Sequence, residues 1–80
     1  MGRVLPRLHW QDVERILFKL GYELKRTKGS HKIYVKSGKL RHVTLPAHRE
    51  LKPGTLHQIV EFQMELTPQQ FLDLLYKRKH

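Results

Sequence analysis

The sequence contains no cysteine, a single tryptophan and few acidic residues. Without cysteine, the chain has no disulfide bond, no cysteine ligand for zinc and no thiol nucleophile. It also lacks any apolar run near the roughly 20 residues that a membrane-spanning helix needs, and no hydrophobic signal-peptide core follows Met1. We therefore expect a cytoplasmic protein with no membrane partner.

The chain is short, and we expect its 80 residues to form a single domain over residues 1–80. A chain of this size buries only about 60% of the surface that its unfolded form exposes. Such a thin core leaves little room for a deep pocket that encloses a small-molecule substrate or cofactor. A large substrate bound at the surface is the better expectation.

Positive charge dominates the composition. Sixteen lysine and arginine residues against seven aspartate and glutamate residues give a formal net charge of +9. Eight of the basic residues lie between Leu24 and Arg49, where there is no acidic residue. Phosphate binding gains its free energy largely from counterion release, so this stretch favours a nucleic-acid partner, RNA above all.

An amphipathic helix is predicted over residues 10–20. Its apolar residues recur at the spacing of one helix face: Trp10, Val13, Ile16, Leu17 and Leu20. Gly21 ends the helix in a left-handed conformation, whereas His9 is a poor N-cap compared with serine or aspartate. Residues 3–9 form a basic lead-in that we expect to be ordered only by packing on the domain.

From Tyr22 the apolar period changes to two, which predicts strands over residues 22–28, 31–36 and 40–45. The short turns at Gly29-Ser30 and Ser37-Gly38-Lys39 make these strands an antiparallel three-stranded sheet.

Alternation along these strands assigns the two faces of the sheet. It predicts an apolar face, covered by helices, that carries Ile33, Val35, Val43 and Leu45. The opposite face, left for a ligand, would carry Lys32, Tyr34, Lys36, His42 and Thr44. His31 falls on the Ile33 side, at the rim of the sheet, and a bulge after Gly29 would reverse that assignment.

Two further helices are predicted after the sheet. Pro53 suits a first helical turn, and the apolar stripe that follows is Leu56, Ile59, Val60 and Met64. Thr67-Pro68-Gln69-Gln70 is a capping box for a short C-terminal helix with the stripe Phe71, Leu74 and Leu75, and Lys77-Arg78-Lys79 complements its dipole.

The predicted fold class is α+β. Its first five elements follow the order α-β-β-β-α of a double-stranded-RNA-binding domain, with the helices on one face of a three-stranded antiparallel sheet and a short C-terminal helix added.

His31 is the candidate catalytic residue. An imidazole takes and gives a proton near neutral pH, as cleavage of RNA by its own 2′-hydroxyl requires. Lys28 and Lys32 beside it would hold the scissile phosphate. The other candidate RNA-binding residues are Ser30, for which the role of a turn residue is the simpler interpretation, Lys36 and Arg41. A purely structural histidine at the end of a strand is the alternative for His31.

A metal site is not predicted. Two-metal nuclease sites need clustered carboxylates, and the seven acidic residues lie mostly on predicted helix surfaces. His42, His48 and His57 have no recognised ligand spacing. We therefore expect no metal and no cofactor.

Three sequence blocks resemble the HicA (YcfA-like) toxins of bacterial and archaeal toxin–antitoxin systems: Gly29-Ser30-His31-Lys32-Ile33-Tyr34, Val43-Thr44-Leu45-Pro46-Ala47-His48 and Leu51-Lys52-Pro53-Gly54-Thr55-Leu56-His57-Gln58-Ile59. The resemblance implies a double-stranded-RNA-binding-like fold, cleavage of mRNA, and a HicB-type antitoxin that covers the active site. The family's catalytic histidine falls on His31, and its Gly-Thr-Leu helix start falls on residues 54–56, a position that we interpret as structural. Residues 60–66 depart from the glycine-containing turn usual in the family.

The predicted function is therefore that of a toxin-type, metal-independent endoribonuclease, an mRNA interferase that inhibits translation and is neutralised by a HicB-type antitoxin. Two alternatives remain. The first is a non-catalytic RNA-binding module that uses the same basic surface. The second is an interaction protein whose basic face meets an acidic partner.

Overall fold

The computed structural model describes residues 5–76. Its helical segments are α1 (Trp10–Lys19), α2 (Pro53–His57), which continues directly as the π-helical segment η1 (Gln58–Gln63), and α3 (Pro68–Leu75). Its strands are β1 (Glu23–Lys28), β2 (His31–Val35) and β3 (Val43–Pro46). The predicted element order is confirmed.

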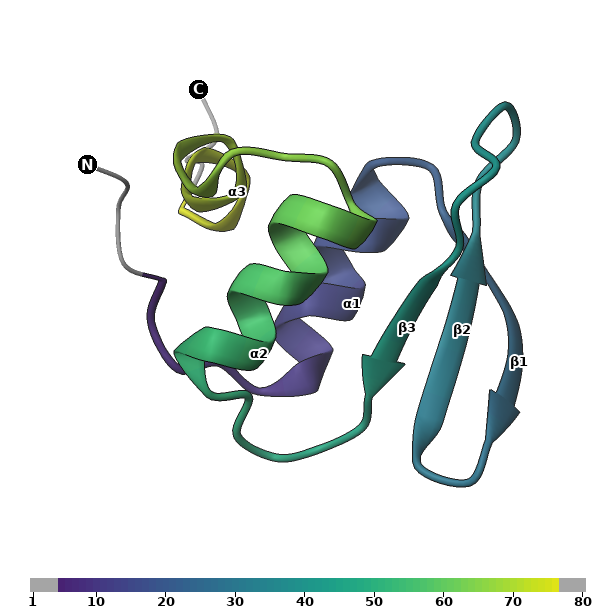
Figure 1. The fold of residues 1–80 in the computed structure, drawn as a ribbon, viewed down its shortest axis with the longest axis horizontal. Coiled ribbons are helices and arrows are strands. Elements are labelled where there is room, and N and C mark those ends of the chain that lie inside the picture. Colours follow the sequence, from purple (N-terminus) through teal and green to yellow (C-terminus); the bar gives the residue numbers. More distant parts are fainter. Residues whose placement is uncertain (1–4, 77–80) are drawn as a thin grey trace.

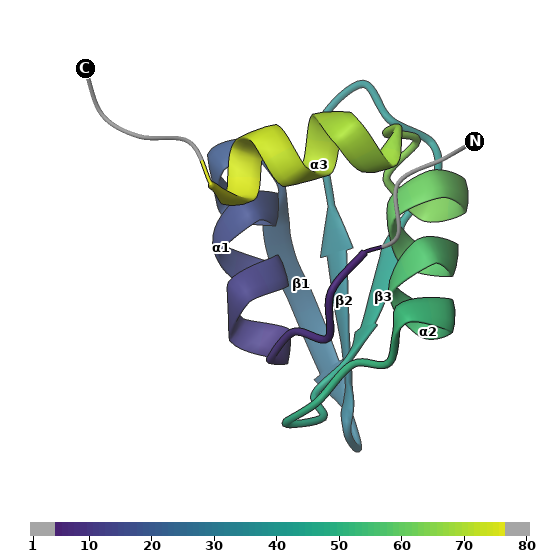
Figure 2. The same ribbon diagram turned by 90° about the vertical axis from the view of Figure 1, so that its left-hand side faces the viewer.

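The three strands form one antiparallel sheet in the order β1-β2-β3. The helices lie on one side of this sheet: Figure 2 shows α1 and α2 side by side in front of it, with α3 across their ends. Figure 1 gives the same arrangement from the side. The fold is thus α+β and like that of a double-stranded-RNA-binding domain, as predicted.

The assignment of faces on β2 is wrong. Tyr34 is fully buried and lies directly opposite Leu24 on β1 and Val43 on β3. Residues that lie directly opposite one another point to the same face, so Tyr34 shares the covered face with Val43, while Ile33 and Val35 point away from the helices. On β3 the predicted faces are correct: Val43 and Leu45 are buried under the helices, and Thr44 lies on the open face opposite Ile33. The chain tolerates a buried tyrosine because its hydroxyl donates a hydrogen bond to a carboxylate of α1.

A bulge is present, but on β1 and not after Gly29. The β1–β2 register shifts between Leu24 and Arg26, and beyond the shift Lys28 pairs with His31. His31 therefore does lie on the Ile33 side, as alternation predicted, but that side is the open face of the sheet.

The start of α1 also differs from the prediction. His9 is an effective N-cap, because its Nδ1 accepts a hydrogen bond from the Gln11 N–H at 3.2 Å. The His9 N–H in turn donates to the Asp12 carboxylate at 3.3 Å, which completes a capping box. At the other end, Gly21 follows the helix with φ +97°, the left-handed conformation that was predicted.

The described part of the lead-in is ordered by packing on the domain, as expected. Leu5 is fully buried, and its N–H donates to His57 Nε2 at 3.3 Å. Leu8 forms a backbone bridge with Leu51, with N···O distances of 3.3 and 2.6 Å. This segment crosses between the helices (Figure 2) and closes one side of the core.

The C-terminal elements agree with the sequence pattern. All four residues of the α2–η1 stripe are buried: Leu56, Ile59, Val60 and Met64. The Thr67–Gln70 capping box of α3 is present, with Phe71 buried and Leu72 added to the core. The predicted basic end of α3, Lys77-Arg78-Lys79, lies outside the described residues. Over residues 5–76, no helix has the length and apolar character that crossing a membrane requires.

Candidate active site beside His31

His31 is the first residue of β2, directly after the Gly29-Ser30 turn, and its side chain is exposed. Gly29 adopts φ +60°, a conformation that favours glycine and lets the chain reverse tightly. Across the sheet, His31 lies opposite Lys28 on β1 and opposite Pro46 on β3. These three side chains therefore form one row on the open face.

A hollow of about 470 Å³ lies next to His31, at the free edge of β3. The strands contribute His31, Thr44 and Pro46 to its lining, and α2–η1 contributes Gly54, Thr55, Gln58, Ile59 and Gln63. Figure 1 shows how α2 and its continuation run alongside β3 and so bring the two groups together. Lys28 and the hollow thus flank His31 on opposite sides.

One hydrogen bond fixes the two walls of the hollow to each other. Gln63 Oε1 accepts a hydrogen bond from the Thr44 N–H at 2.7 Å. Thr44 lies on an edge strand, so this N–H has no strand partner on its outer side. The bond satisfies the edge of the sheet and orients the Gln63 amide at the hollow.

Ser30 contributes through its backbone. Its carbonyl oxygen accepts a hydrogen bond of 2.6 Å from the Ala47 N–H, just after β3. This bond joins the start of β2 to the end of β3, so the segments on both sides of His31 are fixed relative to each other. The Ser30 residue itself is exposed in the turn.

Lys32 and Lys36, two predicted RNA contacts, lie on the other side of β2 from His31. Lys32 Nζ is 4.7 Å from the centroid of the Trp10 ring, and Lys36 Nζ is 5.6 Å from that of Tyr22. These are cation–π contacts with residues in and next to α1. The two lysines therefore help to hold the helix on the sheet.

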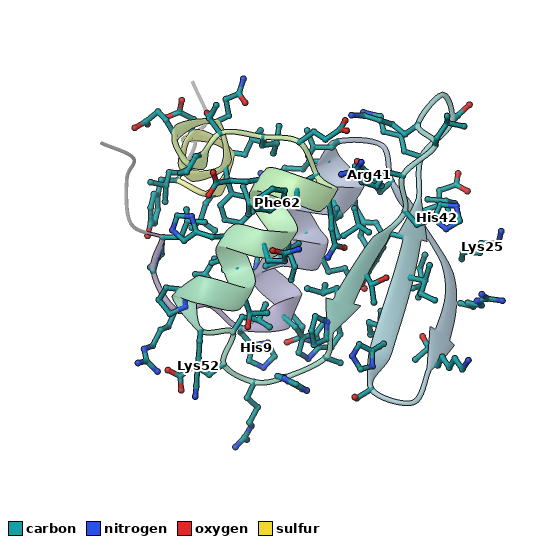
Figure 3. All side chains as sticks on the ribbon, viewed as in Figure 1. His9, Lys25, Arg41, His42, Lys52 and Phe62 are labelled. Carbon is teal, nitrogen blue, oxygen red and sulfur yellow. The ribbon has the colours of Figure 1, made fainter. Side chains whose placement is uncertain are left out.

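Arg41 lies at the opposite end of the sheet from the β1–β2 turn, as Figure 3 shows for Arg41 and its neighbour His42. One of its guanidinium nitrogens donates a hydrogen bond of 2.6 Å to the Phe62 carbonyl oxygen in η1. Of the predicted RNA contacts, the structure thus brings Lys28 and Ser30 to His31 and places Lys32, Lys36 and Arg41 elsewhere.

His31 contributes the one imidazole among the residues that line the hollow. The other lining residues offer hydroxyl, amide and apolar groups. Across residues 5–76, no three histidine or acidic side chains are grouped closely enough to hold a metal ion. Proton transfer by one imidazole is the acid–base chemistry that the lining itself offers.

The wall formed by α2–η1 was missed by sequence reasoning. The sequence pattern indicates a structural helix start at Gly54 and Thr55, and it assigns no site role to Gln58 or Gln63. One signal was present: Gly54, Thr55 and Gln58 recur at helical spacing and form a face of small and polar residues opposite the apolar stripe. What the sequence could not show is that this face lies beside His31.

The fold and this site together define a small, basic α+β protein, like a double-stranded-RNA-binding domain, with an exposed histidine at a sheet-edge hollow. Residues 10–65 match the family model described as HicA toxin of bacterial toxin-antitoxin. The match covers more than half of the 80 residues, so the chain belongs to the HicA toxin family. It is the toxin of a toxin–antitoxin system, and its family implies an antitoxin partner. A search of curated proteins finds no match.

Proposed function

We propose that this HicA-family toxin is an endoribonuclease that cleaves mRNA in the cytoplasm and so inhibits translation, with His31 as its catalytic residue. The observation that carries this proposal is the position of His31: exposed, at the edge of a hollow, and paired across the sheet with Lys28. A histidine with a purely structural role would be expected to have its ring nitrogens bonded within the fold.

The reaction that suits one imidazole is transesterification by the RNA itself. The 2′-hydroxyl loses its proton as its oxygen forms a bond to the adjacent phosphorus, and the bond from phosphorus to the 5′-oxygen breaks. The leaving 5′-oxygen takes up a proton, which gives a 2′,3′-cyclic phosphate and a 5′-hydroxyl end. His31 transfers one of these protons. Water transfers the other, because the lining of the hollow includes no second titratable side chain.

Lys28 supports the chemistry by its charge. It lies opposite His31 on the same face of the sheet, so its ammonium group can approach the phosphate that His31 acts on. Negative charge accumulates on the phosphate oxygens in the transition state, and a nearby cation stabilises it. Ser30 borders this phosphate at the turn, while Lys32, Lys36 and Arg41, which lie away from His31, add positive charge that attracts the RNA beyond the scissile phosphate.

The test compares purified wild-type protein with His31→Ala on a single-stranded RNA, with product ends identified by mass. His42→Ala is the matched control, since His42 is also exposed but precedes β3 at the far end of the sheet. We expect His31→Ala to lose activity by about 100-fold or more, and His42→Ala to cleave like the wild type. Equal cleavage by His31→Ala would overturn the catalytic role.

The same experiment separates the alternatives. RNA binding without cleavage by the wild type would favour a non-catalytic RNA-binding module, and no RNA binding at low salt would favour an interaction protein. A chelator is expected to leave the rate unchanged, because the proposed proton transfers need no metal. Loss of cleavage with chelator, restored by a divalent ion, would contradict metal independence.

We further propose that the antitoxin is of the HicB type and neutralises the toxin by covering the face around His31. The charge of +9 supports a partner with an acidic surface. Co-expression of a HicB-type antitoxin should restore growth that the toxin alone arrests, and should yield a stable complex. A complex in which His31 stays accessible to a histidine-modifying reagent would contradict this mode of neutralisation.

A further inference from the structure

The hollow beside His31 combines apolar and hydrogen-bonding surfaces. Pro46 and the buried Ile59 give it apolar walls, and the remaining lining includes the hydroxyls of Thr44 and Thr55 and the amides of Gln58 and Gln63. Its volume of about 470 Å³ falls in the range of sites that enclose one small organic group. A nucleotide base, flat on its faces and polar at its edges, matches these walls.

Gly54 borders open space, and the fold does not require a glycine at this position. A Cβ atom placed on it would meet no protein atom within 4 Å, and its φ is not in the left-handed region. Alanine would therefore fit and would favour the helix more than glycine does. A glycine with no conformational reason, on the lining of a hollow, is explained by a ligand that approaches the backbone closely.

Gln63 presents a hydrogen-bond donor whose orientation is already fixed. Its Oε1 is occupied by the Thr44 N–H, so the Nε2 group, with its two N–H donors, is the free end of the amide. The structure gives this nitrogen no bond to another side chain or backbone group within the part of the chain that it describes. It lies in a π-helical segment, a conformation that occurs frequently at functional sites.

We propose that the hollow is a subsite for one unpaired nucleotide next to the scissile phosphate. In this subsite Gln63 Nε2 donates a hydrogen bond to the base edge, and the nucleotide passes close to the backbone of Gly54 at the rim of the hollow. This inference rests on the proposed ribonuclease function and deepens it. A base stacked and paired in a duplex cannot enter the hollow, so the toxin selects single-stranded RNA despite its resemblance to a domain that binds double-stranded RNA.

The first experiment measures binding in a His31→Ala background, where the RNA stays intact. A fluorescent single strand and the duplex of the same sequence are titrated against this protein and against versions that also carry Gly54→Ala or Gly54→Val. We expect Gly54→Val to weaken binding of the single strand roughly tenfold, the effect of one lost base contact, and to leave duplex binding unchanged.

The Gly54 variants also distinguish the subsite from a structural role. Alanine should raise the melting temperature by about 2–5 °C, since it favours the helix, while it weakens single-strand binding. A rise in melting temperature with full single-strand binding would overturn the role of Gly54. A fall in melting temperature would show instead that the fold needs this glycine.

The second experiment maps cleavage positions in a pool of random single-stranded RNA. Gln63→Glu keeps an oxygen for the Thr44 N–H but loses the N–H donors, and Gln11→Glu, at an exposed position on α1, adds the same charge away from the hollow. We expect the nucleotide preference beside the cut to change in Gln63→Glu alone. An unchanged preference in Gln63→Glu, or no preference in the wild type, would overturn base contact by Gln63.

These outcomes separate the two proposals. If the wild type does not cleave RNA but Gly54→Val still weakens single-strand binding, the subsite is supported and the ribonuclease function is contradicted. If cleavage depends on His31 while neither Gly54 nor Gln63 affects RNA binding or the nucleotide preference beside the cut, the ribonuclease function is supported and the subsite is contradicted.

Discussion

The Tyr34 hydroxyl donates a hydrogen bond of 2.6 Å to Glu14 Oε2 and so ties β2, the strand that begins at His31, to α1. The ring is fully buried and packs edge-on against Phe18, with 6.0 Å between the ring centroids. Burial, reinforced by the Glu14 carboxylate, raises the pKa of Tyr34 well above its usual range. The phenol therefore remains a hydrogen-bond donor and fixes the strand that carries the candidate catalytic residue.

Tyr34→Phe should lower the free energy of unfolding by about 1–3 kcal/mol, because it removes a hydrogen bond to a charged acceptor and leaves the carboxylate without its partner. The ring packing stays, so the native fold should persist. Urea unfolding followed by circular dichroism measures the loss. Tyr76→Phe, at an exposed tyrosine, is the control and should change stability little. Equal effects of the two substitutions would contradict a stabilising role for the Tyr34–Glu14 bond.

The Tyr34–Glu14 hydrogen bond should also make the stability of the protein depend on pH in the alkaline range. The unfolded chain releases the tyrosine proton at about pH 10, whereas the folded protein retains it because the pKa of Tyr34 is raised. The stabilisation is thus fully present below pH 10 and is lost as pH rises further. Denaturant midpoints between pH 8 and 11 should fall more steeply for the wild type than for Tyr34→Phe. Parallel curves would show that Tyr34 titrates as freely in the folded as in the unfolded protein.

The sequence predicted the element order and most of the core because helical and strand periods are local properties. It failed on β2, where Ile33 and Val35 are more hydrophobic than Tyr34 but Tyr34 has a partner on α1. It failed likewise at His9, whose capping depends on Asp12. The position of His31 followed from the strand start, whereas the hollow depends on how η1 lies against β3. Contacts between distant segments decide such features, and local patterns do not encode them.

Lys28→Ala and Lys36→Ala should have different effects, although each removes one positive charge. Lys28 lies opposite His31, so its loss should lower the cleavage rate on the order of tenfold. Lys36 contacts the Tyr22 ring on the other face, so its loss should cost about 0.5–1 kcal/mol of stability with a smaller effect on the rate. Cleavage kinetics and urea unfolding of both variants test this, with Lys19→Ala on α1 as the charge control. Equal rates for the two variants would contradict a role for Lys28 at the phosphate.

The Lys39–Glu65 ion pair should contribute to acid sensitivity. Its N···O distance is 2.6 Å, and the hydrogen bond lowers the pKa of Glu65 and raises that of Lys39. A lowered carboxyl pKa gives stability that is present above the unfolded value of about 4.3 and is lost as pH falls. Wild-type stability should therefore drop more between pH 5 and 3 than that of Lys39→Ala. Identical acid profiles would show that solvent screens the pair completely.

Glu65 also has a backbone role, since it is the one described non-glycine residue with a positive φ, at +60°. It stands where the chain leaves η1, and glycine adopts such a conformation more readily than a residue with a Cβ atom does. The Lys39 pair helps to hold this conformation in place of a glycine.

Leu5→Ala should be among the most destabilising single changes in the chain. Leu5 is fully buried although it lies in what the sequence presents as a basic lead-in, and its N–H donates to His57 Nε2. The accepting Nε2 requires the proton on Nδ1, which faces Glu61 Oε2 at 2.6 Å, so the segment is tied to α2–η1 by packing and by a polar chain. Truncation to alanine should lower the free energy of unfolding by about 2–5 kcal/mol, because it leaves a cavity in the core. Leu40→Ala is the matched control, because Leu40 is fully exposed, and urea unfolding should find that variant unchanged. If Leu5→Ala is equally neutral, the lead-in contributes nothing to the core and cleavage should survive its deletion.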